Sequence, residues 1–214
     1  MIRIRRLYMH VLILGATGRV GARVLELALA DRHQVTALVR SPGSVRQTSD
    51  GLTLLQGDAR SAADIRRSLQ GADAVISCLS TDGGTVLTEA IPLLIDAMKE
   101  RGVNRIVSVG TAGILQSATH PGLLRYEAPD ARRSSTRAAE EHRRAWERLA
   151  ASGLAWTVVC PTYLPDGEAL GTYRAARDVL PEGGTSISVG DTAAFTYRVA
   201  CHGEYVGCRV GIAY

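Results

Sequence analysis

The feature that most constrains the fold of this chain is a glycine triplet near its start. Residues 9–31 read MHVLILGATGRVGARVLELALAD, so Gly15, Gly18 and Gly21 follow a short apolar run and open a helical pattern. The first glycine permits a sharp turn, the second lets the backbone approach a diphosphate, and the third lets the helix pack closely on a sheet. A second apolar run, 34–39, follows. This context predicts a dinucleotide-binding βαβ unit rather than a purely structural glycine turn.

An arginine follows the second apolar run at the position that selects between dinucleotides. Arg40 stands where an NAD-binding chain usually has an acidic residue for the ribose 2′-hydroxyl. A guanidinium instead suits a 2′-phosphate, so we expect NADP(H) to be preferred over NAD(H). Arg19, inside the glycine turn, is a second candidate for the same phosphate. The alternative for both arginines is that they simply point to water.

Length and composition favour a single domain over residues 9–214. A chain of 214 residues with 46% hydrophobic content can bury a full core. The net charge of +4 is scattered and only 5% of residues are aromatic, so we expect no nucleic-acid partner. Residues 1–8 carry three arginines and are expected to be a frayed N-terminal extension. No apolar run of signal-peptide length follows them, which predicts a cytoplasmic protein without a membrane partner.

The cysteines and histidines do not form a recognisable site. We expect reduced thiols rather than two disulfides, because Cys78 and Cys160 lie in patterns typical of buried strands. We expect no metal centre, because no CxxC pair occurs and the histidines lack ligand spacing. The residues concerned are Cys78, Cys160, Cys201 and Cys208, with His10, His33, His120, His142 and His202.

Strand and helix patterns alternate along the rest of the chain. Further strands are expected at 52–56, 72–79, 104–110 and 155–160, and helices at 61–69, 85–101 and 140–151. Ser61 and Asp64 have capping-box spacing, Gly102 ends a helix, and Pro92 predicts a kink or local break. Near-continuous apolar strands separated by helices predict an α/β fold, a doubly wound parallel sheet with helices on both faces.

Two segments depart from this alternation. Residues 112–134 contain glycines and prolines without a sustained period and follow a predicted strand, so we expect a substrate-side loop there. The C-terminal part predicts a small substrate-side extension. Its expected elements are a strand near 171–179, a turn at 181–184, a short strand at 186–189, a helix after Asp191 and a last strand at 209–213.

Four motifs together resemble the atypical short-chain dehydrogenase/reductases. They are GATGRVG, LVR at 38–40, QGDAR at 56–60 and VNRIVSVGTAG at 103–113, and the chain is most similar to the NAD(P)H-dependent flavin reductase/biliverdin reductase B group. The resemblance extends from Met9 almost to Tyr214 and implies a Rossmann fold with a nicotinamide cofactor. The cofactor-binding residues expected in total are Gly15, Ala16, Thr17, Gly18, Arg19, Val20, Gly21, Arg40, Asp58, Ala59, Cys78, Leu79, Ser80 and Pro161.

The acid–base pair of ordinary short-chain dehydrogenases is missing. Their Tyr-xxx-Lys motif has no counterpart here, since the only lysine is Lys99 and Tyr126 is followed four positions later by Asp130. Interconverting an alcohol and a ketone needs such a positioned pair, whereas hydride transfer to a conjugated acceptor can take its proton from solvent. The sequence therefore favours reduction of a flavin or quinone.

The resemblance also implies candidate catalytic residues. Thr111 occupies the place of the family's active-site serine, His142 aligns with a histidine near the substrate pocket, and Tyr163 takes the place of another. The alternatives are a threonine that caps a strand end, an exposed helix histidine and a packing tyrosine.

We therefore expect an NADPH-dependent oxidoreductase with a small planar acceptor, acting as a monomer or homodimer. The alternative is a non-catalytic NADP(H)-binding redox sensor similar to the nitrogen-metabolite-repressor-like proteins, which the missing Tyr-xxx-Lys pair fits equally well. Sugar-nucleotide epimerisation is disfavoured, because that chemistry uses the missing pair.

Overall fold

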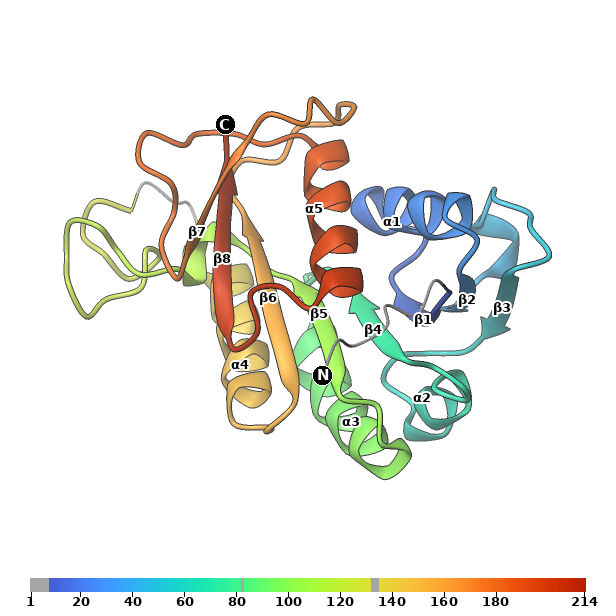
Figure 1. Cartoon of the computed structure of the whole chain (residues 1–214). Coiled ribbons are helices and arrows are strands. Elements are labelled where there is room, and N and C mark those ends of the chain that lie inside the picture. The colour runs from blue at the N-terminus through green and yellow to red at the C-terminus, as the bar shows by residue number, and fades with distance from the viewer. Residues whose placement is uncertain (1–7, 82, 132–134) are drawn as a thin grey trace, which may run out of the picture.

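The structure is a computed structural model that describes residues 8–81, 83–131 and 135–214. Within these residues, eight strands form one sheet in the order β3-β2-β1-β4-β5-β6-β8-β7 (Figure 1). Neighbouring strands are parallel except β7 and β8, which are antiparallel. The strands are β1 (His10–Leu14), β2 (Gln34–Val39), β3 (Leu52–Gln56), β4 (Ala74–Ser77), β5 (Arg105–Val109), β6 (Ala155–Pro161), β7 (Arg174–Arg177) and β8 (Cys208–Ala213).

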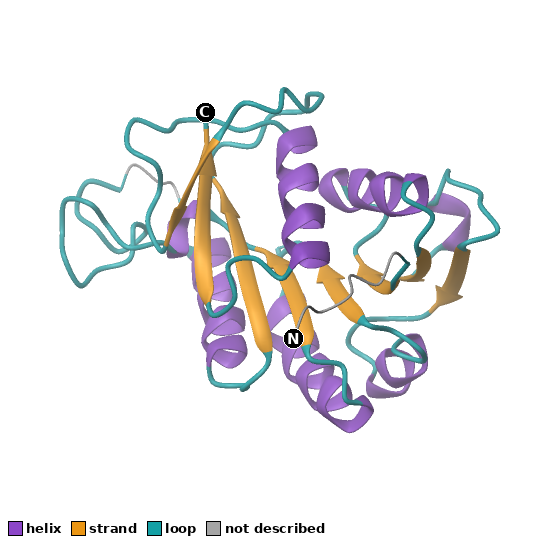
Figure 2. Ribbon diagram, viewed as in Figure 1, coloured by secondary structure: helices purple, strands orange, loops and turns teal. Residues whose placement is uncertain are grey.

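Helices cover both faces of this sheet (Figure 2). They are α1 (Arg19–Ala30), α2 (Ala62–Ser68), α3 (Val86–Arg101), α4 (Arg137–Ala150) and α5 (Val189–His202), with short 3-10 turns η1 (Pro42–Ser44) and η2 (Ala112–Ile114). The core on one face is built with α1 and α5, and the core on the other face with α2, α3 and α4. The expected doubly wound α/β fold of the Rossmann type is confirmed, and β1 and β4 are neighbours inside the sheet.

Local signals at helix ends behave largely as the sequence predicts. The Ser61 hydroxyl accepts a hydrogen bond from the Asp64 amide at 3.3 Å, and Gly102 ends α3 with a left-handed φ of 70°. Of the kink or local break expected at Pro92, the break is wrong, since α3 runs unbroken from Val86 to Arg101. Proline removes one backbone hydrogen bond there, and the buried neighbours on either side keep the helix in place against the core.

The short strand expected at 186–189 is also wrong. Ser186 makes only an isolated bridge with Tyr163, and α5 already begins at Val189. The alternation of serine with isoleucine and valine imitates a strand, but the Ser188 hydroxyl accepts from the Asp191 amide at 3.0 Å. This capping interaction starts a helix instead.

The structure describes the N-terminal extension only in part. Of the N-terminal extension, residues 1–7 lie outside the described residues, and Tyr8 is exposed. All four cysteines lie in the described part as free thiols. Among the described helices, none combines the length and the apolar character needed to cross a bilayer.

Candidate functional site

The glycine turn between β1 and α1 is packed so closely that two of its positions exclude side chains. Gly15 has a φ of +76°, and a Cβ there would lie 2.5 Å from the carbonyl oxygen of Cys78 at the end of β4. A Cβ at Gly21 would lie 2.1 Å from the carbonyl oxygen of Gly15. The first residues of α1 are thereby held directly against the turn and the sheet.

The start of α1 is suited to an anion. Gly18 is its N-cap and offers no side chain to the helix, and the first turn contains no acidic residue. The amides at the start of a helix carry partial positive charge and hydrogen-bond phosphate oxygens. The turn and helix start therefore fit the diphosphate of a dinucleotide.

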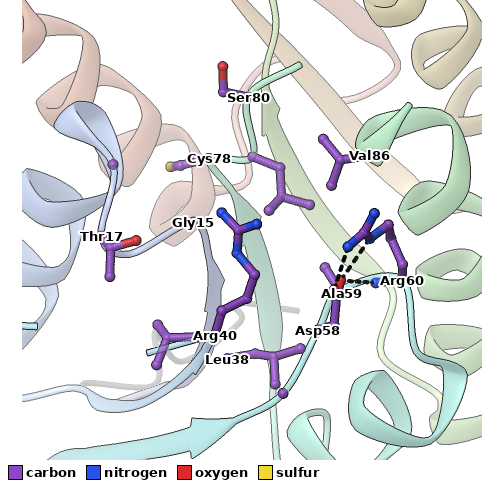
Figure 3. Close-up of a pocket in the computed structure, with 14 residues that line it drawn as sticks. Gly15, Thr17, Leu38, Arg40, Asp58, Ala59, Arg60, Cys78, Ser80 and Val86 are labelled. Carbon is purple, nitrogen blue, oxygen red and sulfur yellow. Dashed lines mark hydrogen bonds and ion pairs between the residues drawn. The ribbon is translucent and has the colours of Figure 1, made fainter. Parts of the chain in front are cut away.

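A cavity of about 200 Å³ lies beside this turn, at the carboxyl ends of the strands (Figure 3). Its walls come from the glycine turn, from the residues after β2 and β3, and from the segment between β4 and α3. The lining residues are Gly15, Thr17, Gly18, Leu38, Val39, Arg40, Gly57, Asp58, Ala59, Arg60, Cys78, Leu79, Ser80 and Val86. Four separate sequence segments thus converge here, as expected of an adenosine and phosphate site.

The structure brings most of the predicted cofactor residues into this cavity, but not all of them. Ala16 and Val20 are buried in the core, and Gly21 packs on the turn. Pro161 is buried at the end of β6 and is not part of the cavity wall. Arg19 points elsewhere: its guanidinium donates to the Leu164 carbonyl and to the Asp166 carboxylate, both at 3.0 Å.

A pair of arginines supplies the positive charge of the cavity. Arg40 is exposed at the end of β2, and Arg60 follows β3. Sequence reasoning missed Arg60, although its place two residues after Asp58 was a signal for a local ion pair. Hydrogen bonds from the Arg60 side chain and amide lower the pKa of Asp58 to about 2, and the Arg40 charge adds to this. The Asp58 carboxylate is therefore ionised at any ordinary assay pH.

The cavity has one thiol in its wall, that of Cys78. Burial raises the pKa of Cys78 to about 12, so the thiolate is scarce at neutral pH. The described residues also contain no group of side chains arranged to hold a metal ion.

The candidate catalytic residues lie outside this cavity. Val109 pairs with Val159 in the parallel sheet, so Thr111, just beyond β5, comes to the level of Pro161, the last residue of β6. The Thr111 hydroxyl accepts a long hydrogen bond of 3.4 Å from the Gly113 amide, which caps η2. Of the three candidates, Thr111 is the one that directly follows a strand of the sheet, β5.

The other two candidates are placed differently. Tyr163 is 71% exposed, so it is not a packing residue. His142 lies on α4, and burial lowers the pKa of its imidazole to about 4. It is therefore neutral at neutral pH and not the exposed helix histidine that was the alternative.

Comparison with known proteins agrees with this geometry. The NAD(P)H-binding family matches residues 15–202. A Bacillus subtilis protein named uncharacterized protein YwnB is 27% identical over 207 residues, which cover 92% of this chain and 94% of that protein. A Streptomyces griseus enzyme named (4-alkanoyl-5-oxo-2,5-dihydrofuran-3-yl)methyl phosphate reductase is 28% identical over 179 residues, with 80% of this chain and 56% of the enzyme covered.

A solved structure extends the similarity to the whole fold. ChuY, titled an anaerobilin reductase from Escherichia coli O157:H7, superposes with a TM-score of 0.76 at 26% identity, and the match covers 94% of this chain and 96% of that one. Because the family match spans the glycine turn, the cavity and the C-terminal helix, this chain belongs to the NAD(P)H-binding family of Rossmann proteins.

Proposed function

We propose that this chain is an NADPH-dependent reductase that transfers hydride to a flavin, a quinone or a similar planar conjugated acceptor. The observation that carries the proposal is Arg40, which lines the cavity beside the glycine turn where an NAD site would present an acid. The names of two relatives, both reductases, support a reductive reaction.

The residues of the cavity, together with Thr111 and Pro161 outside it, have separate roles in this proposal. The amides at the start of α1 bind the diphosphate, and the Arg40 guanidinium binds the 2′-phosphate. Thr111 and Pro161 flank the far end, where the Thr111 hydroxyl orients the reacting ring or the acceptor. When bound, the nicotinamide ring supplies the hydride. The protein accelerates transfer by holding both rings in register.

Proton delivery needs no side chain in this scheme. A conjugated acceptor that gains two electrons and one proton as hydride takes its remaining proton from solvent. Neutral His142 and a Tyr-xxx-Lys pair are therefore not required. A planar acceptor fits this chain better than a simple ketone, whose alkoxide would need a positioned acid.

The first test is oxidation of NADPH by the purified protein with FMN and a simple quinone as acceptors. We expect saturable, protein-dependent turnover. Arg40→Ala should weaken the binding of NADPH by about tenfold or more, which is the contribution of one charged hydrogen bond, and leave the binding of NADH nearly unchanged. Arg46→Ala is the matched control, because Arg46 is also exposed but does not line the cavity.

Two results would contradict the proposal. If Arg40→Ala weakens the binding of NADPH and of NADH equally, Arg40 does not bind the 2′-phosphate. Binding of NADPH without turnover on any acceptor would instead favour a redox sensor, and the search would turn to a protein partner.

A further inference from the structure

Asp58 and Arg60 form a closed ion pair on the wall of the cavity (Figure 3). One carboxylate oxygen accepts from the Arg60 amide at 2.9 Å and from its Nε at 3.1 Å. The other accepts from Arg60 Nη2 at 2.8 Å. Both carboxylate oxygens thus face one guanidinium, the geometry in which arginine binds a carboxylate most strongly.

The surrounding turn fixes this pair in place. The Asp58 amide donates to Asp64 Oδ2 at 3.1 Å, and the Ser61 amide donates to the Asp58 carbonyl at 2.9 Å. A Cβ at Gly57 would lie 2.7 Å from Asp64 Cγ, so Asp64 lies directly against the backbone. The backbone of Asp58 therefore has little freedom to carry its carboxylate away from the cavity.

An ionised carboxylate at this place conflicts with a 2′-phosphate site. Asp58 shares the cavity with Arg40, and the charge of Arg40 acts on it. A phosphate held by Arg40 would be repelled by the same carboxylate. The repulsion between two unit charges at contact is worth about 1 kcal/mol in water and more in a partly buried site. Something must screen Asp58 if NADPH is to bind well.

We propose that Arg60 is a specificity-determining residue that screens Asp58 from the 2′-phosphate bound by Arg40. Arg60 acts through Asp58 and is a positioning residue, so the inference rests on the proposed preference for NADPH. Without Arg60, the Asp58 carboxylate has lost its ion-pair partner, and its repulsion acts on the 2′-phosphate in full. Loss of Arg60 should then shift the preference toward ligands that lack the 2′-phosphate.

The test is binding of adenosine 2′,5′-bisphosphate and of ADP, measured by calorimetry, which needs no acceptor. We expect Arg60→Ala to weaken binding of the bisphosphate about tenfold and to leave binding of ADP unchanged or make it tighter. The double variant D58N/R60A should bind the bisphosphate more tightly than Arg60→Ala does, because the repelling charge is gone as well.

Arg66→Ala is the matched control. Arg66 makes a similar two-bond ion pair with Glu100, and both Arg60 and Arg66 have side chains 47% exposed. It does not line the cavity. It should change the binding of neither ligand.

Three results would overturn the inference, and they can be told apart. If the Arg60→Ala variant binds both ligands as the Arg66→Ala variant does, Arg60 has no role in specificity. A double variant as weak as Arg60→Ala would show that Arg60 contacts the phosphate itself and does not act through Asp58. Unaltered protein that binds neither ligand would overturn the proposed function, and this inference with it.

Discussion

Asp191 shows how much one buried carboxylate can hold together. It is fully buried at the start of α5 and accepts from the Leu170 amide at 3.0 Å, the Gly171 amide at 2.8 Å and the Tyr214 hydroxyl at 2.7 Å. Burial alone would raise its pKa, but these hydrogen bonds outweigh burial and lower the pKa below its usual value. The loop after β6 is therefore fastened to α5 by a charged group.

Asp191→Asn should lower the free energy of unfolding by about 2 kcal/mol, because an amide cannot accept all of these bonds. Asp166→Asn, which is exposed on the same loop, is the control. A lowered pKa stabilises the fold above the unfolded value of about 3.9, and this contribution is lost as the pH falls below it. Urea titrations of both variants at pH 7 and pH 3 check this. If Asp191→Asn loses as much free energy of unfolding at pH 3 as at pH 7, the ionised carboxylate is not what stabilises this contact.

At the scale of elements, the sequence predicted helices and strands well where their signals are local. Ser61 and Asp64 mark the start of α2, and Gly102 marks the end of α3, because capping depends on residues within one turn. The strand expected at 186–189 failed because an alternating pattern was preferred over the equally local signal of Ser188 and Asp191. Recognising that capping pair would have corrected it.

Contacts between distant elements were beyond sequence reasoning. Arg19 was expected at the cofactor phosphate, but its partner Asp166 lies on a loop far along the chain. The side chain of Glu141 likewise reaches from α4 to the start of α3, where the Leu87 amide donates to it at 2.8 Å. Such pairings follow from the packing of elements, which no local pattern specifies.

Glu141 gives a prediction about how α3 is held. Thr85, the N-cap of α3, makes no side-chain capping bond, so the buried Glu141 carboxylate supplies one from α4. Glu141→Ala should cost about 1 to 2 kcal/mol of stability, and Glu141→Gln, which keeps the acceptor oxygen, should cost less. Glu140→Ala is the neighbouring control. Thermal and urea unfolding measure all three, and equal effects of Gln and Ala would argue against capping.

At the scale of the whole molecule, the fold and most residues of the cavity were predictable, and the places of the candidate catalytic residues were not. The glycine triplet and the alternation of elements require a doubly wound sheet, and that topology places Arg40 and Asp58 at one edge. Thr111, His142 and Tyr163 came from resemblance alone. The structure places them on separate elements and outside the cavity beside the glycine turn, since loop geometry has no equivalent of strand register.

The half-buried imidazole of His142 should make the stability of the whole molecule depend on pH. Its pKa is about 4 in the folded protein, against about 6.5 when unfolded. Acidification therefore protonates the unfolded state first, and stability falls as the pH drops below about 6.5.

Between pH 7 and pH 5, the protein should lose up to about 2 kcal/mol more than the variant His142→Gln, measured by urea unfolding. His202→Gln, at the exposed end of α5, is the control for loss of a surface histidine. Parallel pH profiles for the protein and His142→Gln would contradict the half-buried neutral imidazole.

The edge strand β7 has a consequence for how this molecule meets its neighbours. It is only four residues long and carries an arginine at each end. The Arg174 guanidinium donates hydrogen bonds to the carbonyl oxygens of Glu182 and Tyr214. Short, positively charged edges resist recruiting a strand from another molecule. At this margin the sheet is terminated against fibril-like growth, so self-association through β7 is disfavoured.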